Sequence, residues 1–238
     1  MIVLSTSAVS SYLRCHYQYA LGYVYRLRGA QNMAAAIGTA VHSGIEAAHK
    51  SLPAEDALRA SFEEQMASVP ISEAIADPDA LPDALRMLRV YQEEVMPTFH
   101  PTLIEAPFTA KVAGVILSGI LDGADEDVRD TKTTAGKTIN GRKPSSFTPA
   151  SYDLQLSIYA LGYKALTGKL PRRLLLDVLT RRGTYRQYER PMKIGEAVDT
   201  LGIVRDGIDR GDFDPTGAYS GACRWCQFAA TCKYAITD

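Results

Sequence analysis

The chain of 238 residues lacks any apolar run approaching the roughly 20 residues that a helix needs to cross a bilayer. It also lacks internal repeats and low-complexity tracts. Residues 1–11 have neither the basic stretch nor the long apolar core of a secretion signal, so we expect a cytoplasmic protein without membrane contacts, or one of the host cytoplasm if its source is viral. The length and ordinary composition predict one large globular domain with a sizeable core.

Neither sign of charge dominates, because 26 basic and 27 acidic residues give a net charge of −1. Their distribution is nevertheless uneven. Residues 1–128 carry 8 Lys/Arg and 16 Asp/Glu, residues 129–193 carry 14 and 4, and residues 194–238 carry 4 and 7. A central block with a balance of +10 is typical of a surface that binds a polyanion, although a solvated basic surface would give the same pattern.

Cysteine is scarce, and the four cysteines lie at opposite ends of the chain. Cys15 is alone near the start, whereas Cys223, Cys226 and Cys232 form a C-x2-C-x5-C cluster. The four thiols can share one metal site only if the chain returns to its beginning. Such a centre would join the two ends around the residues between them.

Other interpretations of the cysteines compete with a metal centre. Disulfides do not suit a protein that we expect to stay in a reducing compartment, and nothing in the sequence supports redox-active thiols. Unrelated buried thiols are common in protein cores. The spacings suit a four-thiolate zinc ion as well as an iron–sulfur cluster, and geometry alone does not choose between them. A bound metal centre is the favoured interpretation.

Apolar spacing and the positions of proline predict helices in the first hundred residues and a mixture of strands and helices after them. The predicted helices are residues 5–23, 33–52, 55–69, 83–95, 149–167 and 193–210. The predicted strands are residues 103–109, 111–121, 128–133, 174–180 and 184–188, with a hairpin turn at Asp125–Asp127. Residues 70–82 and 134–148 have the composition of loops. This order predicts an α/β fold with a mixed sheet, flanking helices and an N-terminal helical part.

Two acidic residues and a lysine lie around the predicted hairpin. Asp122 ends one strand, and Asp130 and Lys132 are two apart on the next, so their side chains share one face. If the hairpin places Asp122 beside Asp130, the two carboxylates suit Mg²⁺ or Mn²⁺ bound to a phosphate. An adjacent lysine can orient or help deprotonate an attacking water and offset transition-state charge. A surface hairpin with an ion pair would show the same residues.

Five segments and the cysteine cluster carry a family resemblance. The segments are Ser11–Cys15, Gly38–His42, Gly119–Asp122, Asp130–Thr133 and Tyr152–Ala160, which contains a Q-x3-Y pattern. In this order they resemble the RecB-like branch of the PD-(D/E)XK nucleases, in particular the AddB-type and CRISPR-associated exonucleases that carry an iron–sulfur cluster. The resemblance extends over about residues 5–233.

This resemblance implies a restriction-endonuclease-like core at residues 101–213 and a helical part at residues 31–100. It implies an iron–sulfur region that joins residues 1–30 to residues 215–238, all within a single nuclease domain of residues 1–238. The implied cofactors are a 4Fe-4S cluster and Mg²⁺ or Mn²⁺. The implied cluster ligands are Cys15, Cys223, Cys226 and Cys232.

The resemblance also assigns roles around the hairpin. It implies metal ligands at His42, Asp122, Asp130 and the Thr131 carbonyl, and a catalytic lysine at Lys132. Gln155 and Tyr159, one helical turn apart, would face this site together. The alternatives are a structural role for His42 and ordinary helix positions for Gln155 and Tyr159. Glu105 is either a second-metal ligand or an exposed strand residue.

The implied activity is metal-dependent hydrolysis of DNA by an exonuclease that prefers single strands or DNA ends, with 5′-to-3′ polarity suggested by the family. Its setting would be recombination, repair or CRISPR spacer acquisition, with proteins of those assemblies as partners. The alternatives are a catalytically weak adaptor subunit that holds DNA ends, and an RNA-processing enzyme. Sequence-tolerant contacts to the DNA backbone are expected from Lys137, Arg142, Lys143, Arg172, Arg173, Arg181, Arg182 and Arg186.

Overall fold

The structure, a computed structural model, describes residues 1–29, 31–135 and 148–236. Its centre is a six-stranded mixed sheet in the order β1-β3-β4-β5-β6, with β2 also paired to β3. The strands are β1 (Val3–Ser5), β2 (Leu103–Val112), β3 (Val115–Ala124), β4 (Val128–Thr134), β5 (Leu174–Thr180) and β6 (Tyr185–Arg190). The helices before β2 are α1 (Thr6–Arg14), α2 (His16–Tyr19), the π-helix η1 (Ala20–Val24), α3 (Met33–His49), α4 (Ala54–Met66), α5 (Ile71–Ala76) and α6 (Ala80–Glu94). Those after β4 are η2 (Pro149–Tyr152), α7 (Asp153–Thr167), α8 (Ile194–Asp209), α9 (Thr216–Tyr219) and η3 (Ala222–Trp225).

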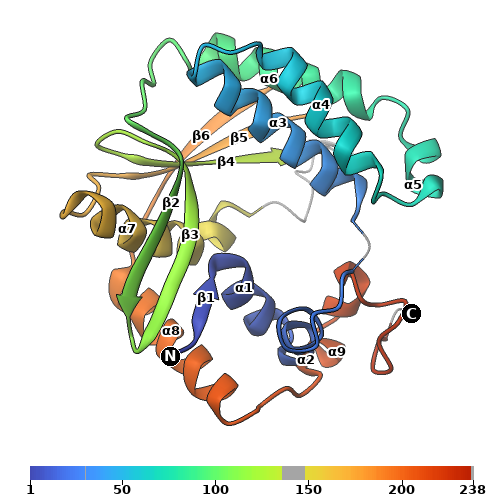
Figure 1. Cartoon of the computed structure of the whole chain (residues 1–238), viewed down its shortest axis with the longest axis vertical. Coiled ribbons are helices and arrows are strands. Elements are labelled where there is room, and N and C mark those ends of the chain that lie inside the picture. Colours follow the sequence, from blue (N-terminus) through green and yellow to red (C-terminus); the bar gives the residue numbers. More distant parts are fainter. Residues whose placement is uncertain (30, 136–147, 237–238) are drawn as a thin grey trace.

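Helices cover both faces of the sheet, which is the α/β arrangement that the order of elements predicts (Figure 1). One apolar cluster packs α7, α8 and α1 against the sheet, with Leu117, Leu156 and Leu176 fully buried in it. A second cluster packs α3, α4 and α6 together above the opposite face, around Leu58 and Leu88. The predicted helical part thus forms a layer of its own on the sheet.

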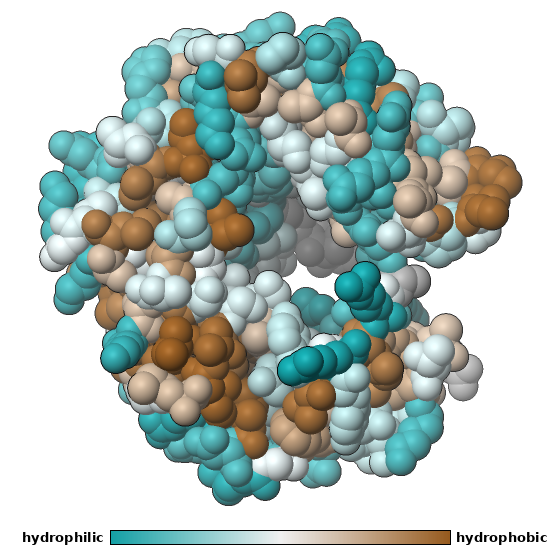
Figure 2. All heavy atoms as spheres, viewed as in Figure 1, coloured by the Kyte–Doolittle hydropathy of each residue, from teal (hydrophilic) through white to brown (hydrophobic). Residues whose placement is uncertain are grey.

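The N-terminal segment with α1 and α2 lies beside the C-terminal segment that begins with α9 (Figure 1). The hydroxyl of Tyr12 donates to the Asp212 carbonyl at 3.0 Å, and the rings of Tyr17 and Tyr234 meet edge to face with centroids 5.0 Å apart. Figure 2 shows that the molecule is hollowed at its centre, between the α3–α4 layer above and the joined ends below. The return of the chain to its beginning, required for a shared cysteine site, is therefore observed.

Four parts of the predicted secondary structure are wrong. Val3–Ser5 forms a parallel strand against β3, where a helix or loop was expected, because three residues are too few to show a strand period. The helix expected to continue to Tyr23 is broken at Cys15, whose backbone is extended. Residues 71–76 form a short helix in the expected loop, and the β2–β3 turn lies at Ala113–Gly114, not near Ala110. No helix among the described residues is long and apolar enough to cross a membrane.

The hairpin turn at Asp125–Asp127 is confirmed, and Asp127 anchors it. The backbone N–H of Asp127 donates to the Asp125 carboxylate at 2.7 Å, while Asp127 accepts from Arg172 Nε at 3.2 Å and Arg173 Nε at 3.0 Å. Burial raises the pKa of the Asp127 carboxyl, but the guanidinium groups of Arg173 and Arg172 outweigh burial and hold that pKa at about 2. The two acids of the turn are therefore structural, and both arginines are engaged within the protein.

This pairing predicts a specific acid sensitivity. Because the pKa of Asp127 is lowered from 3.8 to about 2 on folding, its contribution to stability is complete above about pH 4 and is lost as pH falls toward 2. Asp127→Asn is expected to cost about 2 kcal/mol at neutral pH and to lose less stability on acidification than the wild type. Urea unfolding at pH 7, 4 and 2.5 measures both effects, and parallel acid profiles of the two proteins would contradict this assignment.

Candidate active site

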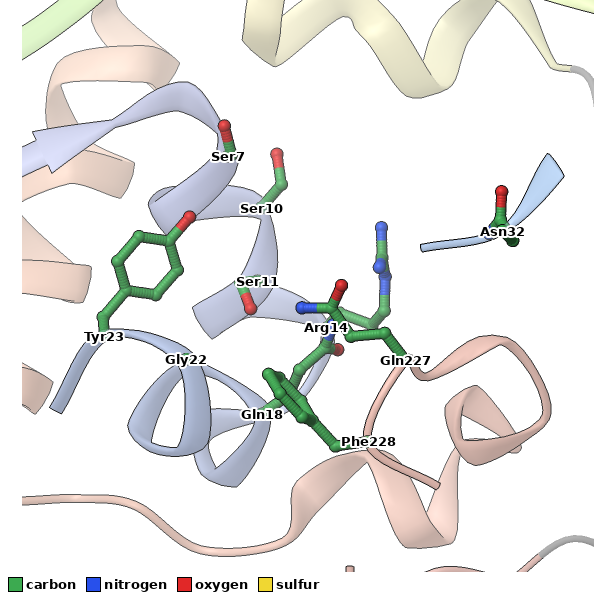
Figure 3. A pocket seen from close by; sticks show the side chains of 10 residues that line it. All are labelled: Ser7, Ser10, Ser11, Arg14, Gln18, Gly22, Tyr23, Asn32, Gln227 and Phe228. Carbon is green, nitrogen blue, oxygen red and sulfur yellow. The ribbon is translucent and has the colours of Figure 1, made fainter. Parts of the chain in front are cut away.

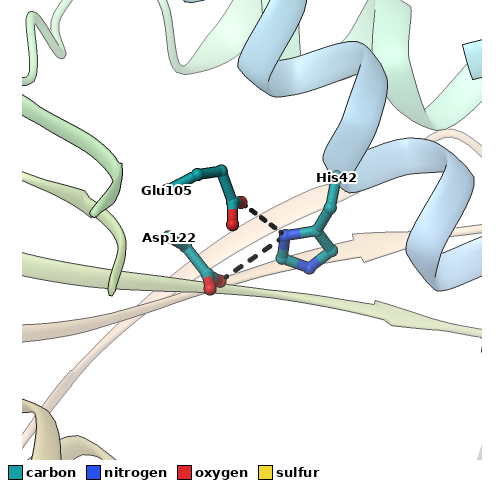
Figure 4. Close-up of side chains that lie close together, drawn as sticks. All are labelled: His42, Glu105 and Asp122. Carbon is teal, nitrogen blue, oxygen red and sulfur yellow. Dashed lines mark ion pairs between the residues drawn. The ribbon is translucent and has the colours of Figure 1, made fainter. Parts of the chain in front are cut away.

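Three side chains from different elements converge where α3 crosses the sheet (Figure 4). His42 of α3 places Nδ1 3.6 Å from Oε1 of Glu105 on β2 and 3.7 Å from Oδ2 of Asp122 on β3. One ligand atom from each residue lies within 4.8 Å of the other two, and all three side chains are partly buried. An imidazole nitrogen and two carboxylates around one point suit a divalent cation such as Mg²⁺ or Mn²⁺.

The divergence of β3 and β4 creates this site. The two strands pair only at Gly123↔Arg129 and Ala124↔Val128, and beyond these residues they separate. Asp122 fills the gap, since its Oδ2 accepts from the Thr131 N–H at 2.8 Å. The Thr131 carbonyl is in turn 3.0 Å from Nε2 of His42. The backbone of Thr131 therefore fixes both Asp122 and His42, and its carbonyl, implied above as a metal ligand, is engaged with His42.

Glu105 has an unusual backbone for a strand residue. Its φ is +41°, in the left-handed region that residues other than glycine seldom occupy, and it lies opposite Asp122 between the pairs Ile104↔Gly123 and Ala106↔Leu121. Such a conformation costs on the order of 1–3 kcal/mol and is concentrated at functional sites. Of the two roles left open for Glu105, this position beside His42 and Asp122 favours the metal ligand.

The electrostatics of His42 match those of a cation site. Burial lowers the pKa of the imidazole, but the Asp122 and Glu105 carboxylates outweigh burial and raise the pKa to about 9. In the metal-free protein the ring is therefore an imidazolium at neutral pH. A positive charge already sits between the two carboxylates where a metal ion would be expected.

Asp130, Lys132, Gln155 and Tyr159 meet on the face of the sheet covered by α7. Asp130 Oδ1 accepts from Lys132 Nζ at 2.8 Å and from Gln155 Nε2 at 3.2 Å, and Gln155 Nε2 is 3.0 Å from the Tyr159 hydroxyl oxygen. Lys132 therefore meets Asp130, and Gln155 meets Tyr159, as the D-x-K and Q-x3-Y spacings predict. Asp130 is not part of the His42–Glu105–Asp122 trio.

Asp130 is fully buried, and its Oδ2 has no hydrogen-bond partner among the described residues. Burial raises the pKa of this carboxyl, Lys132 lowers it, Asp122 raises it, and the net value is about 6. An orphaned buried carboxylate oxygen carries a large desolvation cost, which a cation beside it would remove. The residues present therefore fit a divalent ion held by the trio, with Asp130 near enough for the charges of Asp122 and His42 to act on its carboxyl.

Lys132 is a cation in this setting. Burial lowers the pKa of its amine, but the neighbouring carboxylates of Asp130 and Asp122 outweigh burial and raise the pKa above its ordinary value. An ammonium group donates hydrogen bonds and stabilises negative charge, but it cannot accept a proton from water. Of the roles suggested by the D-x-K spacing, the geometry favours charge stabilisation over deprotonation of the nucleophile.

The four cysteines also come together. Burial raises the pKa of the Cys226 thiol, the Phe228 backbone lowers it, and Cys15, Cys232 and Cys223 lie near enough for their charges to raise it. A glycine permits this approach, because a Cβ at Gly217 would lie 2.6 Å from the Cβ of Cys15 and 3.1 Å from its sulfur.

The residues expected to contact DNA are placed only in part. Lys137, Arg142 and Lys143 lie outside the described residues. Arg181 pairs with Asp77 and Asp83, its Nε being 2.6 Å from the Asp83 carboxylate, so its charge is compensated within the protein. Arg182, also expected at DNA, occupies the turn between β5 and β6. Asp77, which holds Arg181 in place, directly follows α5, the short helix that the sequence did not predict.

Comparison with known proteins places the chain in a family. No protein of curated function matches the sequence. A candidate exonuclease from Eubacterium rectale has the same fold, with a TM-score of 0.57 at 13% identity over 87% of this chain and 79% of that one. The protein SSO0001 aligns over 97% of this chain and 96% of its own, with a TM-score of 0.42 and 15% identity. Residues 3–233 match the family described as the PD-(D/E)XK nuclease superfamily, and the chain therefore belongs to that superfamily of nucleases.

Proposed function

We propose that the protein is a divalent-metal-dependent DNA exonuclease of the RecB-like, iron–sulfur type that acts on single strands or DNA ends. The observation that carries this proposal is the His42–Glu105–Asp122 trio, with the buried Asp130 near enough for the charges of Asp122 and His42 to shift its pKa. Nucleases of this superfamily use divalent metals, and a trio of one imidazole and two carboxylates is a suitable site for one. Intact acidic residues and an intact lysine favour an active enzyme over a binding subunit that has lost its chemistry.

We assign the metal to His42, Glu105 and Asp122, with Asp130 as a proposed further ligand. When bound, Mg²⁺ or Mn²⁺ would polarise the scissile phosphate and lower the pKa of a water molecule. The protein fixes the ligands before substrate arrives, because the Thr131 backbone contacts both Asp122 and His42. Pre-positioned ligands avoid reorganisation during the reaction.

Lys132 stabilises the negative charge that develops on the phosphate oxygens during in-line attack. Gln155 positions it indirectly, by donating to the same Asp130 oxygen that holds the lysine amine. Tyr159 restrains the Gln155 amide at 3.0 Å, and the Tyr152 ring lies 5.5 Å from the Lys132 amine. Gln155 and Tyr159 are therefore positioning residues in this mechanism.

The cysteines are proposed to hold a 4Fe-4S cluster that clamps the two ends of the chain. Cys15 interrupts the N-terminal helices with an extended backbone, and the C-terminal segment approaches it closely at Gly217. The choice of a cluster over a single zinc ion rests on the resemblance of the motifs. The cluster would supply stability and no step of the hydrolysis.

The remaining features of the proposal concern substrate and setting. We propose, from the resemblance of the motifs, a preference for single strands or ends and 5′-to-3′ polarity. The same resemblance suggests partners from recombination, repair or CRISPR adaptation. The central hollow in Figure 2, bordered by the α3 layer and the joined ends, is compatible with a strand that reaches the site from an end.

The test is cleavage of single-stranded DNA labelled at either end, by anaerobically purified protein with Mn²⁺ and with an EDTA control. Metal-dependent shortening from one labelled end is expected, and the label that is lost first defines the polarity. Duplex DNA and RNA of the same sequence test the preference. Tight binding without cleavage, in protein that retains its metal centres, would replace the exonuclease by the end-holding adaptor.

The role of Glu105 gives a separate prediction. Glu105→Gln keeps the size of the side chain but removes one of two carboxylates from the trio, so Mn²⁺ affinity is expected to fall roughly tenfold or more. Isothermal titration with Mn²⁺ measures the change directly. Glu126→Gln, in the exposed part of the hairpin turn, is the matched control. Unchanged affinity in Glu105→Gln would return Glu105 to a purely structural role.

A further inference from the structure

A groove of about 310 Å³ lies on α1, α2, η1 and the C-terminal segment, away from the trio (Figure 3). This volume is within the range of small-ligand sites, which begin at about 300 Å³. We propose that the groove binds one nucleotide unit of a single DNA strand, with the phosphate on Arg14 and a donor group of the base on Gln18. The inference rests on the proposed function for its substrate, and it adds a binding subsite outside the catalytic residues.

The phosphate end of the groove is formed by one face of α1. Ser7, Ser10 and Arg14 follow the i, i+3, i+7 spacing of a single helix face, and all three point into the open space of the groove (Figure 3). Arg14 is exposed and forms no ion pair with any residue that the structure describes. A free guanidinium beside two hydroxyls is a suitable donor set for a phosphodiester oxygen.

The charge of this part of the chain supports an anionic ligand. Residues 1–45 contain three arginines and neither aspartate nor glutamate, although residues 1–128 as a whole are acidic. Arg14, Arg26 and Arg28 therefore lie on a segment without internal carboxylates to compensate them. Local positive charge of this kind raises the concentration of a polyanion near the surface.

Gln18 supplies the second, independent observation. Its side chain lines the groove and is only 7% exposed, yet its Oε1 has no hydrogen-bond donor among the described residues. A buried carbonyl oxygen without a donor costs about 1–3 kcal/mol, which a ligand with an N–H group would recover. Nucleobases carry such N–H groups, whereas inorganic phosphate at neutral pH offers few donors. The orphaned oxygen thus indicates a base next to the phosphate site.

The other walls of the groove suit an unpaired base. Tyr23 is 45% exposed and stacks on Tyr19, with ring centroids 5.0 Å apart, so it offers an aromatic face at the edge of the groove. It belongs to the π-helix η1, an irregular element that is frequent at functional sites. Gly29 allows Gln227 to close the opposite wall, because a Cβ at Gly29 would lie 2.4 Å from Cγ of Gln227.

The groove lies close to elements that carry the catalytic residues. Leu13 of α1 shares a second hollow with Ala150 and Ser151 of η2, the helix that leads into α7. Tyr152, at the end of η2, places its ring 5.5 Å from the amine of Lys132. The helix α1 therefore borders both the groove and the segment that leads to the catalytic residues. This placement predicts that strand binding and bond cleavage are separable by mutation.

The test measures binding without catalysis. Fluorescein-labelled oligothymidylate is titrated with Asp122→Asn protein in EDTA, followed by anisotropy, in three backgrounds: unchanged, Arg14→Gln and Gln18→Leu. Arg14→Gln is expected to weaken binding about five- to tenfold. It should also lower the slope of log Kd against log salt by about 0.7, the value for one phosphate contact to a single strand. Arg59→Gln on α4 removes the same charge far along the chain and is the matched control.

Gln18→Leu tests the base contact. It is expected to weaken binding of oligothymidylate several-fold and to leave binding of an abasic strand unchanged, while removal of the orphaned oxygen keeps the fold stable. The proposed nucleotide site would be overturned if Arg14→Gln and Arg59→Gln weakened binding equally. It would also be overturned if Gln18→Leu weakened binding of oligothymidylate and of the abasic strand equally. Because no step requires metal or turnover, a protein that binds through the groove without cutting DNA would overturn the nuclease proposal alone.

Discussion

Asp122→Asn is expected to reduce metal-dependent DNA cleavage by about a thousandfold or more, which corresponds to about 4 kcal/mol of transition-state stabilisation. The substitution leaves the shape of the side chain and its amide oxygen, which can still accept from the Thr131 N–H. It removes the charge that the trio needs to hold a divalent cation beside His42 and Glu105. The expected loss is therefore of chemistry and metal binding, with the fold retained.

The measurement is single-turnover cleavage of end-labelled DNA over a range of Mn²⁺ concentrations, with thermal unfolding as the check on folding. Asp125→Asn is the matched control, since Asp125 lies three residues further along, in the turn. Among the described residues, its carboxylate accepts only a local backbone N–H. Full activity in Asp125→Asn and none in Asp122→Asn are expected. Cleavage by Asp122→Asn at the wild-type rate in saturating Mn²⁺ would remove Asp122 from the mechanism.

The residues that sequence patterns locate correctly are those whose neighbours are close in the chain. Asp130 and Lys132 share a strand face because their spacing is two, and Gln155 meets Tyr159 because their spacing is one helical turn. The hairpin turn follows from three acidic residues between two apolar runs, and the structure confirms it. In each case the rule that predicts the contact involves fewer than ten residues.

Contacts between distant segments were beyond the reach of these rules. The Asp122 carboxylate meets a backbone N–H of β4 only because the two strands diverge after two pairs, and strand divergence has no local signature. Glu105 stands out in the sequence only as an acid in an apolar strand; its left-handed backbone depends on β3 opposite it. The parallel pairing of β1 with β3 joins residues more than a hundred positions apart.

The same limit affected the charged surface. Counting charges by long blocks assigned the nucleic-acid contacts to residues 129–193, yet Arg172, Arg173 and Arg181 there are engaged with Asp127, Asp77 and Asp83. Only the fold shows which arginines have acidic partners. Arg14, by contrast, lies in a short segment without acidic residues. The positive charge of that segment is hidden when charges are summed over residues 1–128.

Cys226→Ala is expected to abolish the visible absorbance of the iron–sulfur centre and to lower the melting temperature by about 10 °C or more. Binding energy of a structural metal centre is folding energy, and a loss of several kcal/mol shifts the melting temperature of a chain of this size by about that amount. Cys226 lies near Cys15, Cys223 and Cys232. Its removal therefore takes away one of the proposed ligands that join the two end segments of the chain.

Thr231→Ala, beside the last cysteine, provides the control, because its hydroxyl makes only a long 3.3 Å contact to the Phe228 carbonyl within the part of the chain that the structure describes. Cofactor content, melting temperature and Mn²⁺ affinity are measured on all three proteins. The trio lies on α3, β2 and β3 and contains no part of the joined ends, so Mn²⁺ affinity in the folded Cys226→Ala protein should remain within about twofold of wild type. A colourless Cys226→Ala protein with wild-type stability would show that the packing of Tyr12 on Asp212 and of Tyr17 on Tyr234 holds the ends together without a metal centre.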